Sequence, residues 1–135
     1  GASACQTTGI EDSLAAIEGE FVQRPEGVFY SHNSALADAV KSGEHEKLPE
    51  QTLLALANCM KNERAAKSTY RGNPVPLSLV CYQAIGNFAY YEKTDETGDI
   101  VSWPGYVDLP ASQEAFRQAG EAWKEVIEAR VYLWH

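Results

Sequence analysis

The chain contains no long apolar run and few basic residues, and these two shortages argue against a membrane-spanning segment and against a nucleic-acid partner. No stretch of eighteen consecutive apolar residues occurs in its 135 positions, so no segment is expected to span a membrane. Eleven Lys and Arg residues stand against nineteen Asp and Glu residues, giving a net charge of −8. An acidic surface repels the phosphate backbone of nucleic acids and anionic lipids. We therefore expect no nucleic-acid partner.

The sequence also lacks the short motifs that carry catalysis or hold metals and phosphates. Its three histidines, His32, His45 and His135, stand alone, and no HExxH, CxxC or His-x-His pattern occurs. No Gly-x-Ser-x-Gly turn is present for a serine nucleophile, and no glycine-rich loop for a phosphate. The acidic run 95–99 lacks the alternating oxygen ligands of a calcium loop. We therefore expect a non-enzyme with no catalytic residue, no metal site and no cofactor.

What the chain does have is the composition of one folded domain, with 44% hydrophobic and 22% charged residues. We expect this domain to occupy residues 10–135 and residues 1–9 to form a flexible N-terminus. The start, Ala2 to Ala4, has the small-x-small form that signal peptidase cleaves, which favours an exported, periplasmic protein. The alternative is a terminus without any such signal. Cys5 is then either a lipid anchor, part of the removed signal, or paired with a second chain.

Apolar residues recur at helical spacing along most of the chain and predict an all-α fold of four to five helices. The expected helices run from Ile10 to about 23, from Ser34 to about 42, from Pro49 to Met60, from Leu77 to about 88, and from Ser112 onward. Residues 26–33 are expected to form a loop. Consecutive helix pairs resemble a HEAT-like arrangement in spacing. A short turn or β-hairpin is expected near 68–76, where Gly72-Asn73 allows left-handed backbone, and a long loop near 92–110.

Two of the three cysteines lie in apolar helical patterns. Cys59 and Cys81 are 22 positions apart, so two neighbouring helices can bring them together. In an oxidising compartment a bridge between them would stabilise the fold by about 3 kcal/mol. The alternative is a pair of reduced thiols in the core, since free cysteine is among the most buried residue types.

Two surfaces are candidates for contact with a protein partner. The first is the loop from Glu92 to Tyr106, in which aromatic residues follow a cluster of acids, a composition typical of interface hot spots. Its candidate contact residues are Glu92, Asp95, Glu96, Asp99, Trp103 and Tyr106. The alternative is that the two aromatics pin this loop to the core. The second is the 66–76 turn, whose exposed residues would be Tyr70, Arg71 and Asn73.

Part of the chain, from Pro49 to Tyr91, resembles the periplasmic immunity proteins that protect bacteria from type VI secretion amidase effectors. The similar segments are Leu-Ala-Asn-Cys59-Met, Tyr-Arg-Gly-Asn-Pro-Val-Pro76 and Val-Cys81-Tyr. The resemblance implies an all-helical, non-enzymatic inhibitor that is often dimeric. It also implies a cognate peptidoglycan-hydrolase effector as the partner, whose active-site cleft is occluded by a protruding loop.

Two other functions are compatible with the same residues. One is an exported domain that binds a small ligand in a pocket lined by Tyr and Trp between its helices. The other is a lipid-anchored helical protein of the cell envelope. A cell-wall hydrolase works on an acidic polymer, so an acidic loop that enters its basic groove favours the inhibitor hypothesis over these two.

Overall fold

The computed structural model describes residues 2–41, 49–91, 93–94, 96–102, 107 and 109–134. Within these ranges the chain forms five helices and eight short strands. The helices are α1 (Ala2–Ala15), α2 (Asn33–Lys41), α3 (Glu50–Cys59), α4 (Leu77–Gly86) and α5 (Gln113–Ala129). The strands are β1 (Glu20–Arg24), β2 (Gly27–Tyr30), β3 (Ala65–Tyr70), β4 (Asn73–Pro76), β5 (Ala89–Tyr90), β6 (Lys93–Thr94), β7 (Ile100–Ser102) and β8 (Leu133–Trp134). The expected boundary at residues 9 and 10 falls inside α1.

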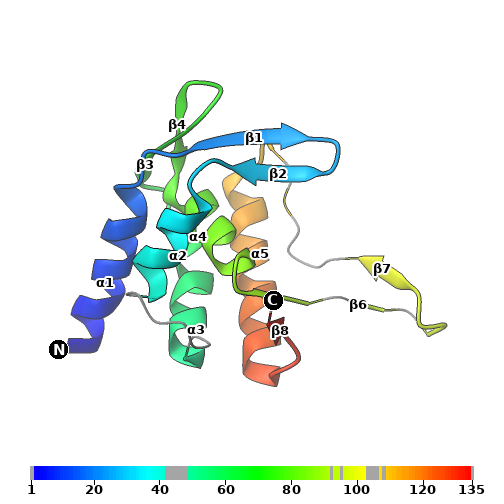
Figure 1. Cartoon of the computed structure of the whole chain (residues 1–135). Helices are drawn as coiled ribbons and strands as arrows, with labels where there is room; N and C mark the ends of the chain where they lie inside the picture. The colour runs from blue at the N-terminus through cyan, green and yellow to red at the C-terminus, as the bar shows by residue number, and fades with distance from the viewer. Residues whose placement is uncertain are drawn as a thin grey trace.

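A four-stranded mixed sheet lies across one end of the helices (Figure 1). Its strand order is β2-β1-β3-β4, in which β1 and β3 are parallel and the two outer pairs are antiparallel hairpins. Two smaller sheets pair β5 with β8 and β6 with β7. In Figure 1 the β3–β4 turn rises above the rest of the molecule, while β8 lies at the opposite end of α5.

The all-α expectation is therefore wrong, and the fold is mixed α/β. The first helix ends at Ala15, and the residues expected to continue it form β1, which pairs with β2 through a two-residue turn. Phe21 fits the apolar spacing of a helix as well as that of a strand. In the strand, it lies across the hairpin from Tyr30, and the centres of the two rings are 4.4 Å apart. No HEAT-like stacking of helix pairs is found among the described elements, and the expected long loop contains β6 and β7.

The later helices and the turn near 68–76 follow the sequence expectations. α3 begins after Pro49, α4 begins at Leu77, and Ser112 caps α5 by accepting a hydrogen bond from the Ala115 amide at 3.1 Å. The turn is the β3–β4 hairpin. Its left-handed residues are Arg71 and Gly72, one position earlier than the sequence indicated.

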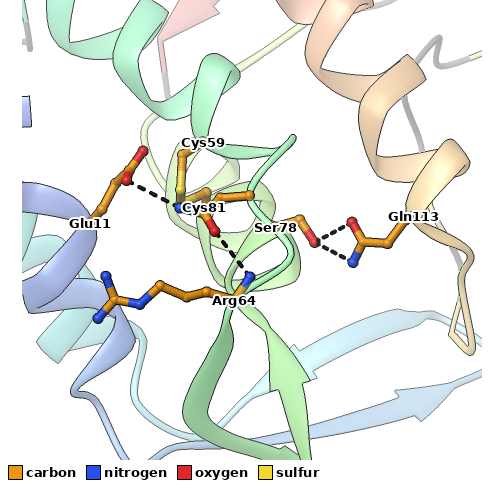
Figure 2. Close-up of a disulfide and its surroundings, with 7 residues drawn as sticks. Glu11, Cys59, Arg64, Ser78, Cys81 and Gln113 are labelled. Atoms are coloured by element: carbon orange, nitrogen blue, oxygen red, sulfur yellow. Dashed lines mark hydrogen bonds between the residues drawn. A yellow bond between two sulfur atoms is a disulfide. The ribbon is translucent and has the colours of Figure 1, made fainter. Parts of the chain in front are cut away.

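The core lies between the helices and the inner face of the sheet. Cys59 and Cys81 form a disulfide that joins α3 to α4, with 5.9 Å between their Cα atoms, and both are buried (Figure 2). α5 packs closely on α3 at Gly120, where an added Cβ atom would lie only 2.7 Å from the Ala57 carbonyl oxygen. This disulfide is compatible with an exported protein. No helix in the described ranges is long and apolar enough to cross a membrane.

Candidate functional site

The first predicted contact surface is described only in part. Glu96 and Asp99 are exposed on the β6–β7 hairpin, where the Thr97 hydroxyl donates a hydrogen bond to the Asp99 carboxylate at 3.2 Å. The other four candidates of that surface lie outside the described residues: Glu92, Asp95, Trp103 and Tyr106. A contact surface on this loop therefore stays a prediction.

The second predicted surface is brought together at the tip of the β3–β4 hairpin. Tyr70 and Asn73 are paired across the turn, and Arg71 and Gly72 form its two central residues. Their φ angles of 54° and 80° are those of a type I′ turn, whose twist matches that of the two strands. The β3–β4 turn that carries the three residues rises above the rest of the molecule (Figure 1); Arg71 and Asn73 are exposed there, whereas Tyr70 is half-buried and packs against the core.

Arg71 is an unusual residue for its position in this turn. A left-handed backbone costs an L-residue about 1–2 kcal/mol, and Asn, Asp or Gly normally occupies the first central position of a type I′ turn. The Arg71 side chain is exposed and stacks over the Tyr70 ring, 5.1 Å from the guanidinium carbon to the ring centroid. Among the described residues it forms no ion pair. Arg71 is therefore a strained residue whose charged side chain contributes little to the stability of the fold.

A hollow of about 310 Å³ opens beside this hairpin tip. One wall comes from the hairpin and the other from the segment that precedes α5. Its lining residues are Tyr70, Arg71, Asn73, Pro74, Val75, Pro76, Leu79, Leu109, Pro110 and Ala111. Val75 and Leu79 are almost fully buried and form its apolar floor. The lining residues outside 70–76 could not be found from the sequence, because Pro110 stands 34 positions after Pro76 and only folding brings them together.

The two walls of the hollow are fixed to the same framework by hydrogen bonds. The Gln23 side chain accepts a hydrogen bond from the Leu109 amide at 2.8 Å, which ties the second wall to β1. Ser78 of α4 and Gln113 of α5 exchange hydrogen bonds at 3.2 and 3.3 Å (Figure 2). These bonds hold the 109–111 segment to β1 and the start of α5 to α4.

The base of the hairpin is anchored next to the disulfide (Figure 2). The first amides of α4, at Leu77 and Ser78, donate to the carbonyls of Arg64 and Asn62 at 2.7 and 2.9 Å. The Asn62 side chain accepts from the Arg64 amide at 3.0 Å and donates to the Glu11 carboxylate at 3.2 Å. These contacts satisfy the first two amides of α4, whose residues are buried, without a capping side chain.

A buried hydrogen-bond chain holds β3 against β2 and the segment before β1. The Tyr30 hydroxyl and the Ser68 hydroxyl are 2.7 Å apart, and Ser68 donates to the Ile17 carbonyl at 2.8 Å. Burial raises the pKa of the Tyr30 phenol, because the charged phenolate would lose its hydration. Next to this chain, Gly19 has no room for a Cβ atom because the Tyr30 ring occupies the space.

The described cations divide into a paired group and an unpaired group. The ion pairs join Lys61 to Glu121 at 2.8 Å, Arg64 to Asp12 at 2.7 Å, Arg130 to Glu50 at 3.5 Å, and Arg117 to Glu114. These cations lie on α5, directly after it, or in the turn that follows α3. Arg24, Lys67 and Arg71 in the four-stranded sheet and its β3–β4 turn, and Lys124 on α5, have no such partner in the described parts of the chain. Because exposed Glu20 and Glu26 lie on the same sheet as Arg24 and Lys67, the unpaired positive charge at the hairpin tip is that of Arg71.

A second, smaller hollow of about 240 Å³ lies between α3 and α5. Lys61 and Glu121, which form an ion pair, line it together with Gly120, where the two helices approach. In the described ranges, no group of three His, Cys, Asp or Glu side chains is close enough to hold a metal ion. The absence of a metal or cofactor in the working protein stays a prediction.

Comparison with known proteins gives no match: no family model, no curated protein and no solved structure is significantly similar to this chain. The resemblance to all-helical immunity proteins of type VI secretion is not supported, since the fold is mixed α/β and no match favours that family. The candidate site must therefore be interpreted from its own geometry.

Proposed function

We propose that this chain is a non-enzymatic binding protein that contacts a protein partner through the tip of the β3–β4 hairpin. The observation that carries the proposal is the backbone of Arg71, an exposed cation held in a left-handed conformation without an ion-pair partner in the described chain. Strain of this kind persists where the surrounding structure imposes it, and it is concentrated at functional sites.

The composition of the tip supports the same proposal. Tyrosine and arginine are among the residues that contribute most to binding energy at protein interfaces. Here the two are adjacent and already stacked, so little side-chain freedom remains to be lost on binding. A narrow hairpin that projects beyond the body of the protein suits insertion into a cleft. We propose that the chain acts as an inhibitor that occludes such a cleft in its partner.

The disulfide supports work in an oxidising compartment, and we place the protein in the periplasm. Buried cystines are typical of exported proteins and rare in the cytosol.

Site-specific photo-crosslinking tests the proposed function. A photoreactive phenylalanine analogue replaces Asn73 at the hairpin tip or, as a control, Lys124, an exposed residue on α5. After irradiation of cells that produce the protein, position 73 should yield one defined adduct that excess wild-type protein abolishes, and position 124 should not. Equal adducts from both positions, or none from position 73, would refute the proposal.

A further inference from the structure

We propose that the hollow beside the β3–β4 hairpin accepts an acidic segment of the protein partner, with one apolar side chain in the hollow and a neighbouring carboxylate on Arg71. This inference rests on the proposed function and names the chemistry of the segment that is bound. It reverses the sequence-based expectation of an acidic loop that enters a basic groove.

The apolar part of the site has the size and lining for one large aliphatic side chain. Its 310 Å³ is about twice the 150 Å³ of an engineered apolar cavity that holds a benzene molecule, and it lies at the small end of ligand pockets. Pro74, Pro76 and Pro110 form its sides, and the ring of each has little freedom to lose when a ligand binds. Val75 and Leu79 close its floor.

The polar part of the site lies at its mouth. The Arg71 guanidinium offers a planar pair of N–H donors that matches a carboxylate, and the Asn73 side-chain amide donates a hydrogen bond to the Arg71 carbonyl at 3.4 Å. No carboxylate of the described residues is paired with this guanidinium. Binding an acidic group there would therefore not require breaking an ion pair inside the protein.

Charge complementarity also favours an acidic ligand at this end of the molecule. With a net charge of −8, most of the surface repels a carboxylate. On the rest of the sheet, exposed Arg24 and Lys67 are balanced by exposed Glu20 and Glu26, so the local attraction for a carboxylate comes from Arg71 itself. A carboxylate of the bound segment is thus favoured next to Arg71.

The edge of β4 determines how such a segment docks. Two of its four residues, Pro74 and Pro76, have no backbone N–H, which makes this edge unsuited to pairing with an added strand. A peptide at this edge must be held by side-chain contacts instead of a β-ladder. The sequence of the bound segment would therefore be selected by two contacts, one with the apolar hollow and one with the Arg71 guanidinium.

Nuclear magnetic resonance titration of the full chain tests the inference with three blocked peptides: acetyl-Gly-Leu-Asp-Gly-amide, its Asn analogue in place of Asp, and its Ala analogue in place of Leu. The Leu-Asp peptide should shift the amide signals of residues around the hollow, including Tyr70, Leu79 and Ala111. It should bind about fivefold more tightly than the Asn analogue, because a charged hydrogen bond is lost in that analogue. The Ala analogue should also bind more weakly.

The variant Arg71→Gln removes the cation and keeps the hairpin polar, and its dispersed amide spectrum verifies folding. In this variant the Asp and Asn peptides should bind equally, while Lys124→Gln should retain the fivefold difference. Equal binding of both peptides to the wild type, shifts confined to another surface, or no binding at about 10 mM peptide would overturn the inference.

The peptide test and the crosslinking test fail separately. If position 73 crosslinks specifically but the wild type does not distinguish Asp from Asn, the acidic-segment inference is wrong and the proposed function stands. If position 73 gives no adduct, the proposed function fails whatever the peptides show.

Discussion

Replacing Arg71 by asparagine is expected to stabilise the protein and to weaken its binding to the partner at the same time. Asn-Gly is the preferred pair for a type I′ turn, because the short side chain of Asn tolerates the left-handed backbone. The φ angles of 54° and 80° at positions 71 and 72 already have the values that an Asn-Gly turn adopts. The substitution therefore needs no movement of either strand.

The size of the stability change follows from two opposing contributions. Relief of the left-handed strain stabilises the variant by about 1 kcal/mol, and loss of the contact between Arg71 and the Tyr70 ring destabilises it by about 0.5 kcal/mol. The net gain is about 0.5 kcal/mol, or about 2 °C in melting temperature for a domain of this size. Arg71→Ala retains the strain and loses the contact, so it should destabilise the fold by about 0.5 kcal/mol.

Urea denaturation followed by circular dichroism measures both variants against the wild type. The expected order of unfolding free energy is Asn, then Arg, then Ala, with about 1 kcal/mol between the extremes. Both variants should bind the partner more weakly, since both lack the cation. If Arg71→Asn is no more stable than Arg71→Ala, the arginine is not strained, and the argument that it is kept for binding is refuted.

Three further predictions concern the framework that holds the hairpin. Cys59→Ala with Cys81→Ala should lower the unfolding free energy by about 3 kcal/mol, from the 22-residue loop that the disulfide closes; a loss below about 1 kcal/mol in urea denaturation would contradict this. In the same assay, Gly120→Ala should lower the unfolding free energy by about 1–2 kcal/mol, because its Cβ atom would meet the Ala57 carbonyl. The matched control Gly86→Ala has open space around it and should be neutral or stabilising. Equal effects of the two substitutions would argue against the close contact between α3 and α5. Burial raises the pKa of both Tyr30 and Tyr91 above the ordinary value of 10.0. The contribution of these two phenols to the free energy of unfolding is therefore complete below pH 10 and is lost as the pH rises further. Tyrosinate absorbance should show the two ionising only as the protein unfolds, and full ionisation of all seven tyrosines in the folded state would disprove this.

The helices after Pro49 could be predicted because their signals are local. Pro49, Pro76 and Ser112 mark helix starts by their own chemistry, and the apolar stripes that follow have a clear helical period. The β3–β4 turn was predictable for the same reason, since glycine and prolines stand close together in the sequence.

The strand β1 could not be predicted because distant contacts decide its conformation. Phe21 continues the apolar spacing of the first helix, and local pattern alone favours a longer helix. Its strand conformation depends on packing against Tyr30, whose hydroxyl contacts Ser68, 38 residues further along the chain. No short sequence window contains that information.

The candidate site was half predictable. The sequence indicated Tyr70, Arg71 and Asn73 as exposed turn residues; the structure places all three at one hairpin tip, but only Arg71 and Asn73 are exposed, and Tyr70 is half-buried against the core. The opposite wall of the hollow comes from residues 109–111, which only the folded chain brings near. Its position depends on the hydrogen bond from the Leu109 amide to Gln23, 86 residues away in sequence.

The most direct test of the proposed binding role is the affinity of the crosslinked partner, once purified, for three proteins: wild type, Arg71→Ala and Lys124→Ala. Both substitutions remove one exposed cation that has no ion pair in the described chain, but from opposite regions of the molecule. Isothermal titration calorimetry should show a loss of at least about tenfold for Arg71→Ala and no change for Lys124→Ala. Equal affinities for all three proteins would contradict a role of the β3–β4 hairpin in binding.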